Sequence, residues 1–317
     1  MKLKTFILMA VMTAGMNVQA QNQEERNAKI ISLLQEEHKN LNHYEQTPMY
    51  YLQVDKQSCR VLIDIDDIIL GTQFTEDYGE TMLIPINGYL RCSGKHKCNI
   101  KVLPTSKENT ISEKAWVNVK VLYLENKTDA LSDAKEIGEL LSLPQDISKM
   151  NRQEIDLSTS FNVTLPYDYS NILSTAKDLR DVPNLEQKVI AYYNKIHSWI
   201  KNCDLYSKLY ARKDLWILGD MYYLTDKNIF FAATIGEEDI YDHTLIDREV
   251  LPIENYEMII CGNGRLVQLR RKKYYDTVLK VKYFESENDK KKNTETYSET
   301  TIMLYMPNGS DEFKMFY

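Results

Sequence analysis

Residues 116–124 read Trp-Val-Asn-Val-Lys-Val-Leu-Tyr-Leu. Successive side chains of an extended strand point to opposite faces, so the apolar residues at alternate positions from Val117 to Tyr123 share one face. Asn118 and Lys120 take the other face. The stretch therefore predicts a strand with one face in a core and one toward solvent, an alternation typical of antiparallel sheets.

Similar short stretches on both sides of residues 116–124 predict an antiparallel β-sandwich domain over residues 48–165. The expected strands are 49–54, 59–65, 68–74, 82–91, 97–103, 116–124 and 158–165. Between the last two, residues 129–143 have helical character. We expect them to form a helix that covers an edge or end of the sandwich.

One hairpin of this region has a recognisable pattern. Residues 89–95 (YLRCSGK) are followed by residues 98–102 (CNIKV). Together they resemble the L-x-x-G-x-N-x-I-x-V hairpin of galactose-binding-like jelly rolls, although Lys97 or a nearby polar residue stands where that pattern has Asn. The resemblance implies a β-sandwich. It does not imply sugar binding, because the pattern describes the hairpin and not the loops that hold sugars.

The chain contains five cysteines, and an odd number leaves at least one unpaired within a monomer. They are Cys59, Cys92, Cys98, Cys203 and Cys261. Cys92 and Cys98 flank a turn signal at 93–95, and we expect them on the same side of a hairpin, as candidates for a cross-strand disulfide. The alternative is two small buried thiols. His96 lies beside them, but no second Cys/His pair at finger spacing follows, so we expect no metal site.

The spacing of apolar residues along the sequence changes after residues 166–183. This stretch is bounded by prolines, and we expect it to connect two domains. Apolar residues then recur at intervals of three and four, which predicts a long amphipathic helix. They are Leu185, Val189, Tyr192, Ile196, Ile200 and Cys203. This stripe predicts that Ile196 is buried and that Lys195 is exposed.

Strand signals near the C-terminus predict an antiparallel meander. The expected strands are 256–261, 265–271, 277–285, 298–306 and 313–317. Asn263-Gly264 and Asn308-Gly309 are strong hairpin signals, because these residues accept positive φ. A long helix followed by a meander resembles the nuclear-transport-factor-like and cystatin-like α+β cones over residues 184–317. The resemblance implies that a small-molecule site would lie between the helix and the strands near 256–271.

The N-terminus reads as an export signal. Met1 to Ala20 contain a basic start, an apolar run at 6–16 and small residues just before Gln21, the pattern of a cleaved signal peptide. The apolar run is too short to cross a hydrocarbon core of about 30 Å. The leader resembles those of exported Bacteroidota proteins, which implies a periplasmic or secreted protein. Residues 21–47 are expected to contain a leading helix.

Composition excludes some partners. The 317 residues carry 39 Lys and Arg against 46 Asp and Glu, a net charge of −7, so the chain lacks the basic surplus that phosphate neutralisation requires, and nucleic acid is not an expected partner. No segment after the leader is apolar enough to predict a membrane span. The 22 tyrosines suit ligand-binding or partner-binding surfaces, and they also suit half-buried strands.

Two polar stretches read as turns. Residues 64–67 (DIDD) lie between alternating apolar stretches, so Asp66-Asp67 predicts a hairpin turn in preference to a calcium loop, which needs six to eight oxygen ligands. Residues 262–265 (GNGR) link two expected strands. A phosphate-binding loop leads into a helix, so these residues also predict a turn.

The sequence contains no nucleophile or metalloprotease motif of the GxSxG, HExxH or CxxC type and predicts no cofactor. His243, beside Asp242, is the candidate general base, and His197 is expected at the border of the helix. We therefore expect an exported, non-enzymatic binding protein whose partner is a protein, a glycan or a small ligand. The alternatives are a periplasmic immunity or inhibitor protein and a hydrolase-type enzyme with its site in the C-terminal domain.

Overall fold

A computed structural model describes residues 24–71, 74, 77–144, 151–212, 214–235 and 239–316. The expected signal peptide, Met1 to Ala20, and its cleavage point lie outside these residues. Within them, α-helices combine with four antiparallel sheets.

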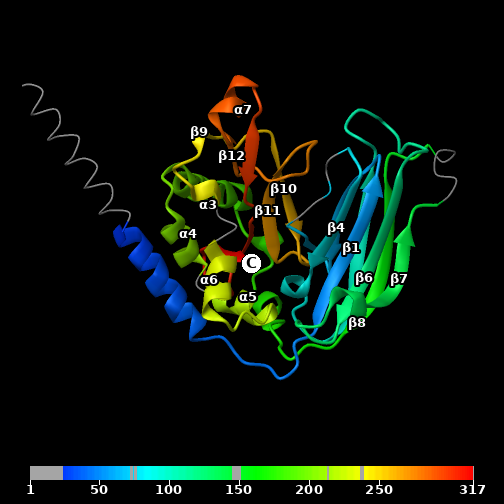
Figure 1. Ribbon diagram of the computed structural model, residues 1–317, viewed down its shortest axis with the longest axis horizontal. Coiled ribbons are helices and arrows are strands. Elements are labelled where there is room, and N and C mark those ends of the chain that lie inside the picture. The colour runs from blue at the N-terminus through cyan, green and yellow to red at the C-terminus, as the bar shows by residue number, and fades with distance from the viewer. Residues whose placement is uncertain are drawn as a thin grey trace, which may run out of the picture.

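The first half of the chain forms two sheets of four strands each (Figure 1). The first has the order β4-β1-β6-β7, with β1 Met49–Gln57, β4 Glu80–Pro85, β6 Trp116–Leu124 and β7 Lys135–Ser142. The second has the order β3-β2-β5-β8, with β2 Arg60–Ile65, β3 Ile68–Ile69, β5 Gly94–Leu103 and β8 Ile155–Val163.

Alternate residues of both sheets point into one shared core. In β6, Val117, Val119 and Val121 are each 1% exposed. Asn118 and Lys120, which alternate with them, are half-buried. Ile63 of β2 belongs to the same core. Full burial of such a side chain contributes about 1.5–3 kcal/mol. The strand predicted at 116–124 is therefore confirmed with its boundaries and its inward face.

The helix expected at 129–143 is wrong. A short 3-10 turn, η2 Leu131–Asp133, leads into β7, whose Ile137 pairs with Val121 of β6. The open edge of β6 offers backbone donors and acceptors. Pairing with this edge gives hydrogen-bond partners to more backbone N–H and C=O groups than an isolated short helix would. Tertiary pairing therefore outweighs the helix propensity of this stretch.

Two other expected strands are shorter than predicted. The strand expected at 82–91 ends at Pro85 and is followed by a 3-10 turn, η1 Asn87–Tyr89. The strand expected at 68–74 is reduced to β3, while Phe74 makes an isolated bridge to Val61. These changes place Gly71 outside the strands and Tyr89 at the end of η1.

The second half of the chain forms the other two sheets. One has the order β10-β11-β14-β15, with β10 Tyr256–Cys261, β11 Leu266–Arg271, β14 Met303–Tyr305 and β15 Lys314–Phe316. The other has the order β13-β12-β9, with β9 Ile246–Val250, β12 Lys280–Phe284 and β13 Thr296–Glu299. Helix α7, Glu287–Lys291, joins β12 to β13.

The single strand expected at 298–306 is therefore two strands in different sheets. Between them the N–H of Thr300 donates to the carbonyl of Leu279 at 3.1 Å. The chain thus leaves the β12 sheet at Glu299 and joins the β11 sheet at Met303, so the expected single meander is wrong.

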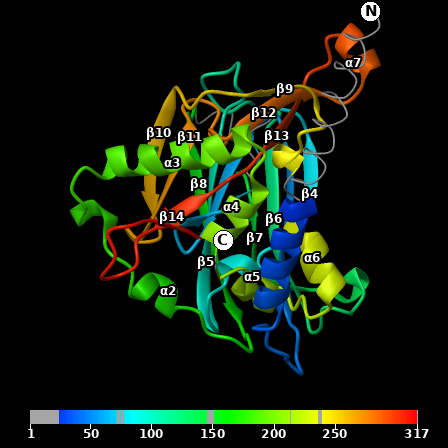
Figure 2. The same cartoon turned by 90° about the vertical axis from the view of Figure 1, so that its left-hand side faces the viewer.

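Helix α3, Leu185–Lys201, lies across this region (Figure 2). Its buried residues share a core with β11, β12 and β14. They are Leu185, Val189, Tyr193, Ile196 and Ile200. Ile196 is buried and Lys195 is exposed, as predicted. Tyr193, and not the expected Tyr192, is fully buried, and its hydroxyl donates to Ile302 O and accepts from Leu269 N, both at 2.9 Å.

A layer of helices packs beside the sheets. It contains helix 24–38, α4 Leu205–Ala211, α5 Leu215–Met221 and α6 Lys227–Ile235. Leu34 of the leading helix shares a core with Phe230 of α6, and Met221 of α5 belongs to the core of the first two sheets. The expected connector holds α2, Asn171–Ser174. None of the described helices is both long and apolar enough to cross a bilayer.

Candidate ligand-binding site

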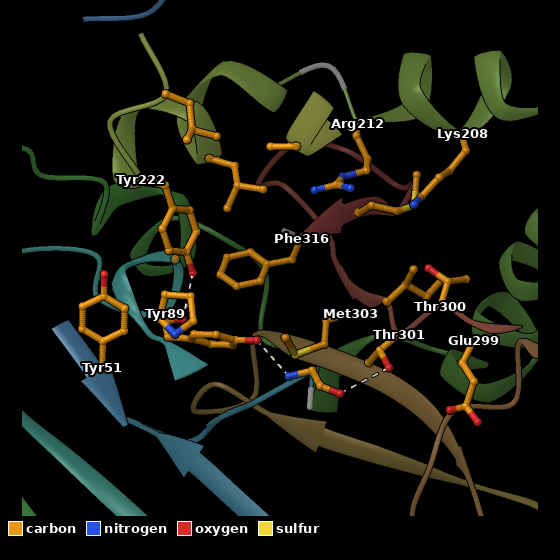
Figure 3. A pocket seen from close by; sticks show the side chains of 18 of the residues that line it. Tyr51, Tyr89, Lys208, Arg212, Tyr222, Glu299, Thr300, Thr301, Met303 and Phe316 are labelled. Carbon is orange, nitrogen blue, oxygen red and sulfur yellow. Dashed lines mark hydrogen bonds between the residues drawn. The ribbon is translucent and has the colours of Figure 1, made fainter. Parts of the chain in front are cut away.

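A cavity of about 680 Å³ lies where the first two sheets meet the helical layer and the last strands (Figure 3). We call it the cleft. The first half of the chain contributes β1, η1 and the segment around Gly71, while α4, α5, α6, β14 and β15 contribute from the second half. The residues used below are Met49, Tyr51, Gly71, Gly88, Tyr89, Lys127, Lys208, Arg212, Tyr222, Glu299, Thr301, Met303, Met315 and Phe316.

Gly88 and Tyr222 form one wall of the cleft by direct contact. A Cβ atom at Gly88 would lie 2.8 Å from the phenolic oxygen of Tyr222, a separation that real side chains do not tolerate. The Tyr222 hydroxyl donates to the carbonyl of Pro85 at 3.1 Å. The missing side chain at position 88 thus allows the ring to pack on the backbone of η1.

Gly71 joins this wall to the opposite side. Its N–H donates to the hydroxyl of Tyr89 at 2.8 Å. Its carbonyl accepts from the Thr301 hydroxyl at 3.5 Å, the weaker of the two bonds (Figure 3). These contacts connect η1 with the segment before β14, so backbone and hydroxyl groups from both halves of the chain hold the shape of the cleft.

Three cations belong to the lining of the cleft. Lys127 donates through Nζ to the carbonyls of Tyr222 and Tyr223, at 2.9 and 3.2 Å, near the C-terminal end of α5. Burial lowers the pKa of Lys127. Lys208 of α4 is only 2% exposed, and Arg212 is the residue that caps the same helix.

One carboxylate accompanies these cations among the described lining residues. It belongs to Glu299, whose Oε1 pairs with Lys280 outside the cleft. Among the described lining residues, three cations therefore stand beside a single carboxylate, which is paired outside the cleft.

The remaining lining is largely apolar. Met49, Met303, Met315 and Phe316 are buried around the cavity. The guanidinium of Arg91 lies over the Phe316 ring at 4.1 Å, which fixes that ring. Methionine side chains adapt to irregular apolar shapes, so the cleft combines a deformable apolar floor with cationic and hydroxyl groups.

The two cysteines that the sequence singled out are not on facing strands. Cys98 is buried in the interior of β5, which is continuous from Gly94, and Cys92 lies just before that strand. Both are free thiols, as are Cys59, Cys203 and Cys261. The hairpin expected around residues 93–95 is wrong, because β5 starts at Gly94 and runs straight on. The geometry assumed for a disulfide is therefore absent.

The two candidate bases lie apart from the cleft. His197 Nε2–H donates to the carbonyl of Leu251 at 2.9 Å. His243 is exposed and lines a separate cavity of about 470 Å³ together with Asp239 and Asp242. The expected site between α3 and the strands near 256–271 is instead filled by the core around Tyr193.

Both predicted turns are confirmed. Asp66 and Asp67 have φ of 52° and 67° in the tight turn between β2 and β3. Gly262 and Asn263 start the turn between β10 and β11, and the backbone N–H of each donates to Asp67 at 2.8 Å, to its carbonyl and its carboxylate respectively. The two turns therefore pack against each other. No group of three or more potential metal ligands occurs in the part of the chain that the structure describes.

Sequence reasoning missed a contact between the buried His96 and the exposed Asp66. His96 Nδ1 lies 2.5 Å from Asp66 Oδ2, and His96 Nε2 lies 2.9 Å from the carbonyl of Cys92. Burial lowers the pKa of His96, but the hydrogen bonds to Asp66 and Cys92 outweigh it, so the net pKa is raised. Both ring nitrogens are occupied, and the pair orders the β2–β3 turn against β5.

The chain was compared with protein-family models, with curated proteins and with solved structures, and none of them matches.

Proposed function

We propose that the protein is an exported, non-enzymatic binding protein whose cleft holds a small amphipathic anion, such as a carboxylate or phosphate on an apolar body. The observation that carries this proposal is the placement of Lys127, Lys208 and Arg212 around an apolar floor. The one carboxylate among the described lining residues, that of Glu299, is already paired. A carboxylate or phosphate group could accept charge-assisted hydrogen bonds from these cations, whereas a purely apolar ligand would leave the hydroxyl groups unused.

The size and construction of the cleft support this proposal. Its volume of about 680 Å³ falls in the range of small-molecule sites, which combine apolar walls with a few placed polar groups. Gly71 and Tyr222 hold the walls through hydrogen bonds, so little ordering is needed on binding.

The proposal includes the finer organisation of the chain. We place a β-sandwich domain at 48–165 and an α+β domain at 184–317, with 166–183 as connector and the cleft between the domains. Separate cores around β6 and around α3 support this division, although α5 packs on the first core. Export rests on the leader pattern of Met1 to Ala20.

Two fluorescent probes of similar shape test the proposal: the anion 1-anilinonaphthalene-8-sulfonate and the uncharged N-phenyl-1-naphthylamine. We expect the anion to bind at one saturable site. Arg212→Gln should weaken its affinity about tenfold, because one charge-assisted contact is lost. The uncharged probe binds both proteins equally. Lys195→Gln, on the exposed face of α3, serves as the matched control and leaves both affinities unchanged.

A second variant separates charge from shape. Thr301→Trp places a large ring at the cleft wall and should reduce the binding of both probes. If the anion fails to saturate, or if Arg212→Gln and Thr301→Trp both leave its affinity unchanged, the proposed function is wrong.

A further inference from the structure

A second cavity of about 820 Å³ lies beside the cleft. We call it the groove. Arg60 and Asp77 line it from the first half of the chain, and β11 with the segment 271–280 lines it from the second. The groove shares Gly71, Glu299 and Thr301 with the cleft, but its chemistry is different.

The charges that line the groove are matched. Arg271 Nε donates to Asp276 at 2.7 Å, and Lys280 Nζ lies 2.8 Å from the same carboxylate and also pairs with Glu299. Arg270 pairs with Glu257 at 2.7 Å. Burial alone would raise the pKa of Asp276. The hydrogen bonds from Arg271 and Lys280 outweigh burial, so the net pKa is lowered and this carboxylate stays ionised.

Arg60 and Asp77, from the first half of the chain, are held by hydrogen bonds to backbone groups. Arg60 donates to the carbonyls of Pro104 and Lys273, both at 2.8 Å. Asp77 accepts from the N–H of Ser106 at 2.7 Å. The groove therefore presents a dense row of fixed donors and acceptors with no large excess of either charge, unlike the cleft.

Three tyrosines complete the groove. Tyr274 is 51% exposed and lies against the guanidinium of Arg271 at 4.5 Å, while Tyr297 is 45% exposed and lies 5.3 Å from Lys280 Nζ. The guanidinium of Arg270 lies 4.9 Å from the ring of Tyr275. The backbone of Tyr275 has a φ of 65°, a conformation that bulky residues rarely adopt. The cations orient these rings, and two of the rings remain open to solvent.

We propose that the groove is a second binding site, for a neutral saccharide. The exposed rings of Tyr274 and Tyr297 offer apolar faces to the C–H faces of sugar rings. Hydroxyl groups, which donate and accept at once, match the carboxylate and guanidinium groups that line the groove. A strongly charged ligand would disturb ion pairs that are already complete. Tyr274, Tyr297 and Asp276, which support this proposal, line the groove and not the cleft.

The test is a glycan microarray followed by titration calorimetry with the neutral glycan that binds best. Tyr274→Ala and Tyr297→Ala should each weaken binding about tenfold, the scale of one aromatic contact. Tyr210→Ala is the matched control, because Tyr210 is 49% exposed on α4 and does not line the groove. It should change the affinity by less than about twofold.

Thermal melting of each variant separates a lost site from lost folding, since all three side chains are exposed. Binding of 1-anilinonaphthalene-8-sulfonate should be unchanged in Tyr274→Ala, which distinguishes the groove from the cleft. The proposal is overturned if no glycan binds, if only sulfated or acidic glycans bind, or if Tyr210→Ala weakens binding as much as the two groove variants.

Discussion

Tyr169 donates a 2.6 Å hydrogen bond to the carboxylate of Asp220. The same carboxylate accepts from the backbone N–H of Asn42 at 2.7 Å and from the hydroxyl of Tyr44 at 3.1 Å. Asp220 is 1% exposed. It therefore joins the segment before β1, the connector and α5, the helix that supplies Leu218 to the cleft.

Removing this carboxylate should destabilise the whole chain. Asp220→Ala leaves two phenols, the backbone N–H of Asn42 and the side-chain amide of Asn42 without their acceptor, and we expect a loss of about 3 kcal/mol in the free energy of unfolding. Chemical denaturation measures it. Asp220→Asn keeps one carbonyl oxygen and should lose less. A change below about 0.5 kcal/mol in Asp220→Ala would show that the three segments are held by other contacts.

Glu37 should make stability depend on pH. Burial raises its pKa from 4.5 to about 7, and the backbone bond from Trp216 opposes this only in part. A raised carboxyl pKa stabilises the fold below about pH 4.5, and that contribution is lost as the pH rises through about 7. Glu37→Gln should therefore raise stability at about pH 8 by about 1 kcal/mol, after allowance for solvent screening, and by little at about pH 4.

Thermal melts of wild type and Glu37→Gln across this pH range provide the measurement. Glu25→Gln, at an exposed position of the same helix, is the control and should show no such pH dependence. A Glu37→Gln benefit that is equal at both ends of the range would contradict the assignment.

The His96–Asp66 pair should be visible by NMR. The raised pKa of His96 means that its contribution to stability is complete below about pH 6.5 and is lost as the pH rises through the folded-state value. Asp66→Asn removes the carboxylate and should lower the pKa of His96 in an imidazole proton titration. An unchanged His96 titration curve in Asp66→Asn would show that the contact does not control the proton.

The sequence was most informative where one strand face is buried. Alternation in β6 predicts its boundaries because each inward valine meets the opposite sheet. The helix prediction at 129–143 fails because residues 135–142 pair with the edge of β6, and this pairing overrides helix propensity. The choice of Tyr193 over Tyr192 depends on the acceptor at Ile302, which is distant in sequence.

The cleft could not be predicted from spacing. Lys127 follows β6, while Lys208 and Arg212 belong to α4, and only the packing of the helices on the sheets brings them to one cavity. Part of the groove could be recognised in the sequence, because charged and tyrosine residues cluster at 270–276. In sequence that cluster resembles an ordinary solvated turn, and only the fold brings Arg60 and Asp77 to the same cavity.

The central claim is that the cleft binds an amphipathic anion, and methionine methyl NMR tests it most directly. Met49, Met303 and Met315 line the cleft, whereas Met258 lies on β10 away from it. Titration of the folded protein with dodecanoate, in a protein carrying ¹³C-methyl methionine, should shift the three cleft signals together along one saturable curve and leave Met258 in place. Unmoved cleft signals, or equal shifts at Met258, would contradict the account.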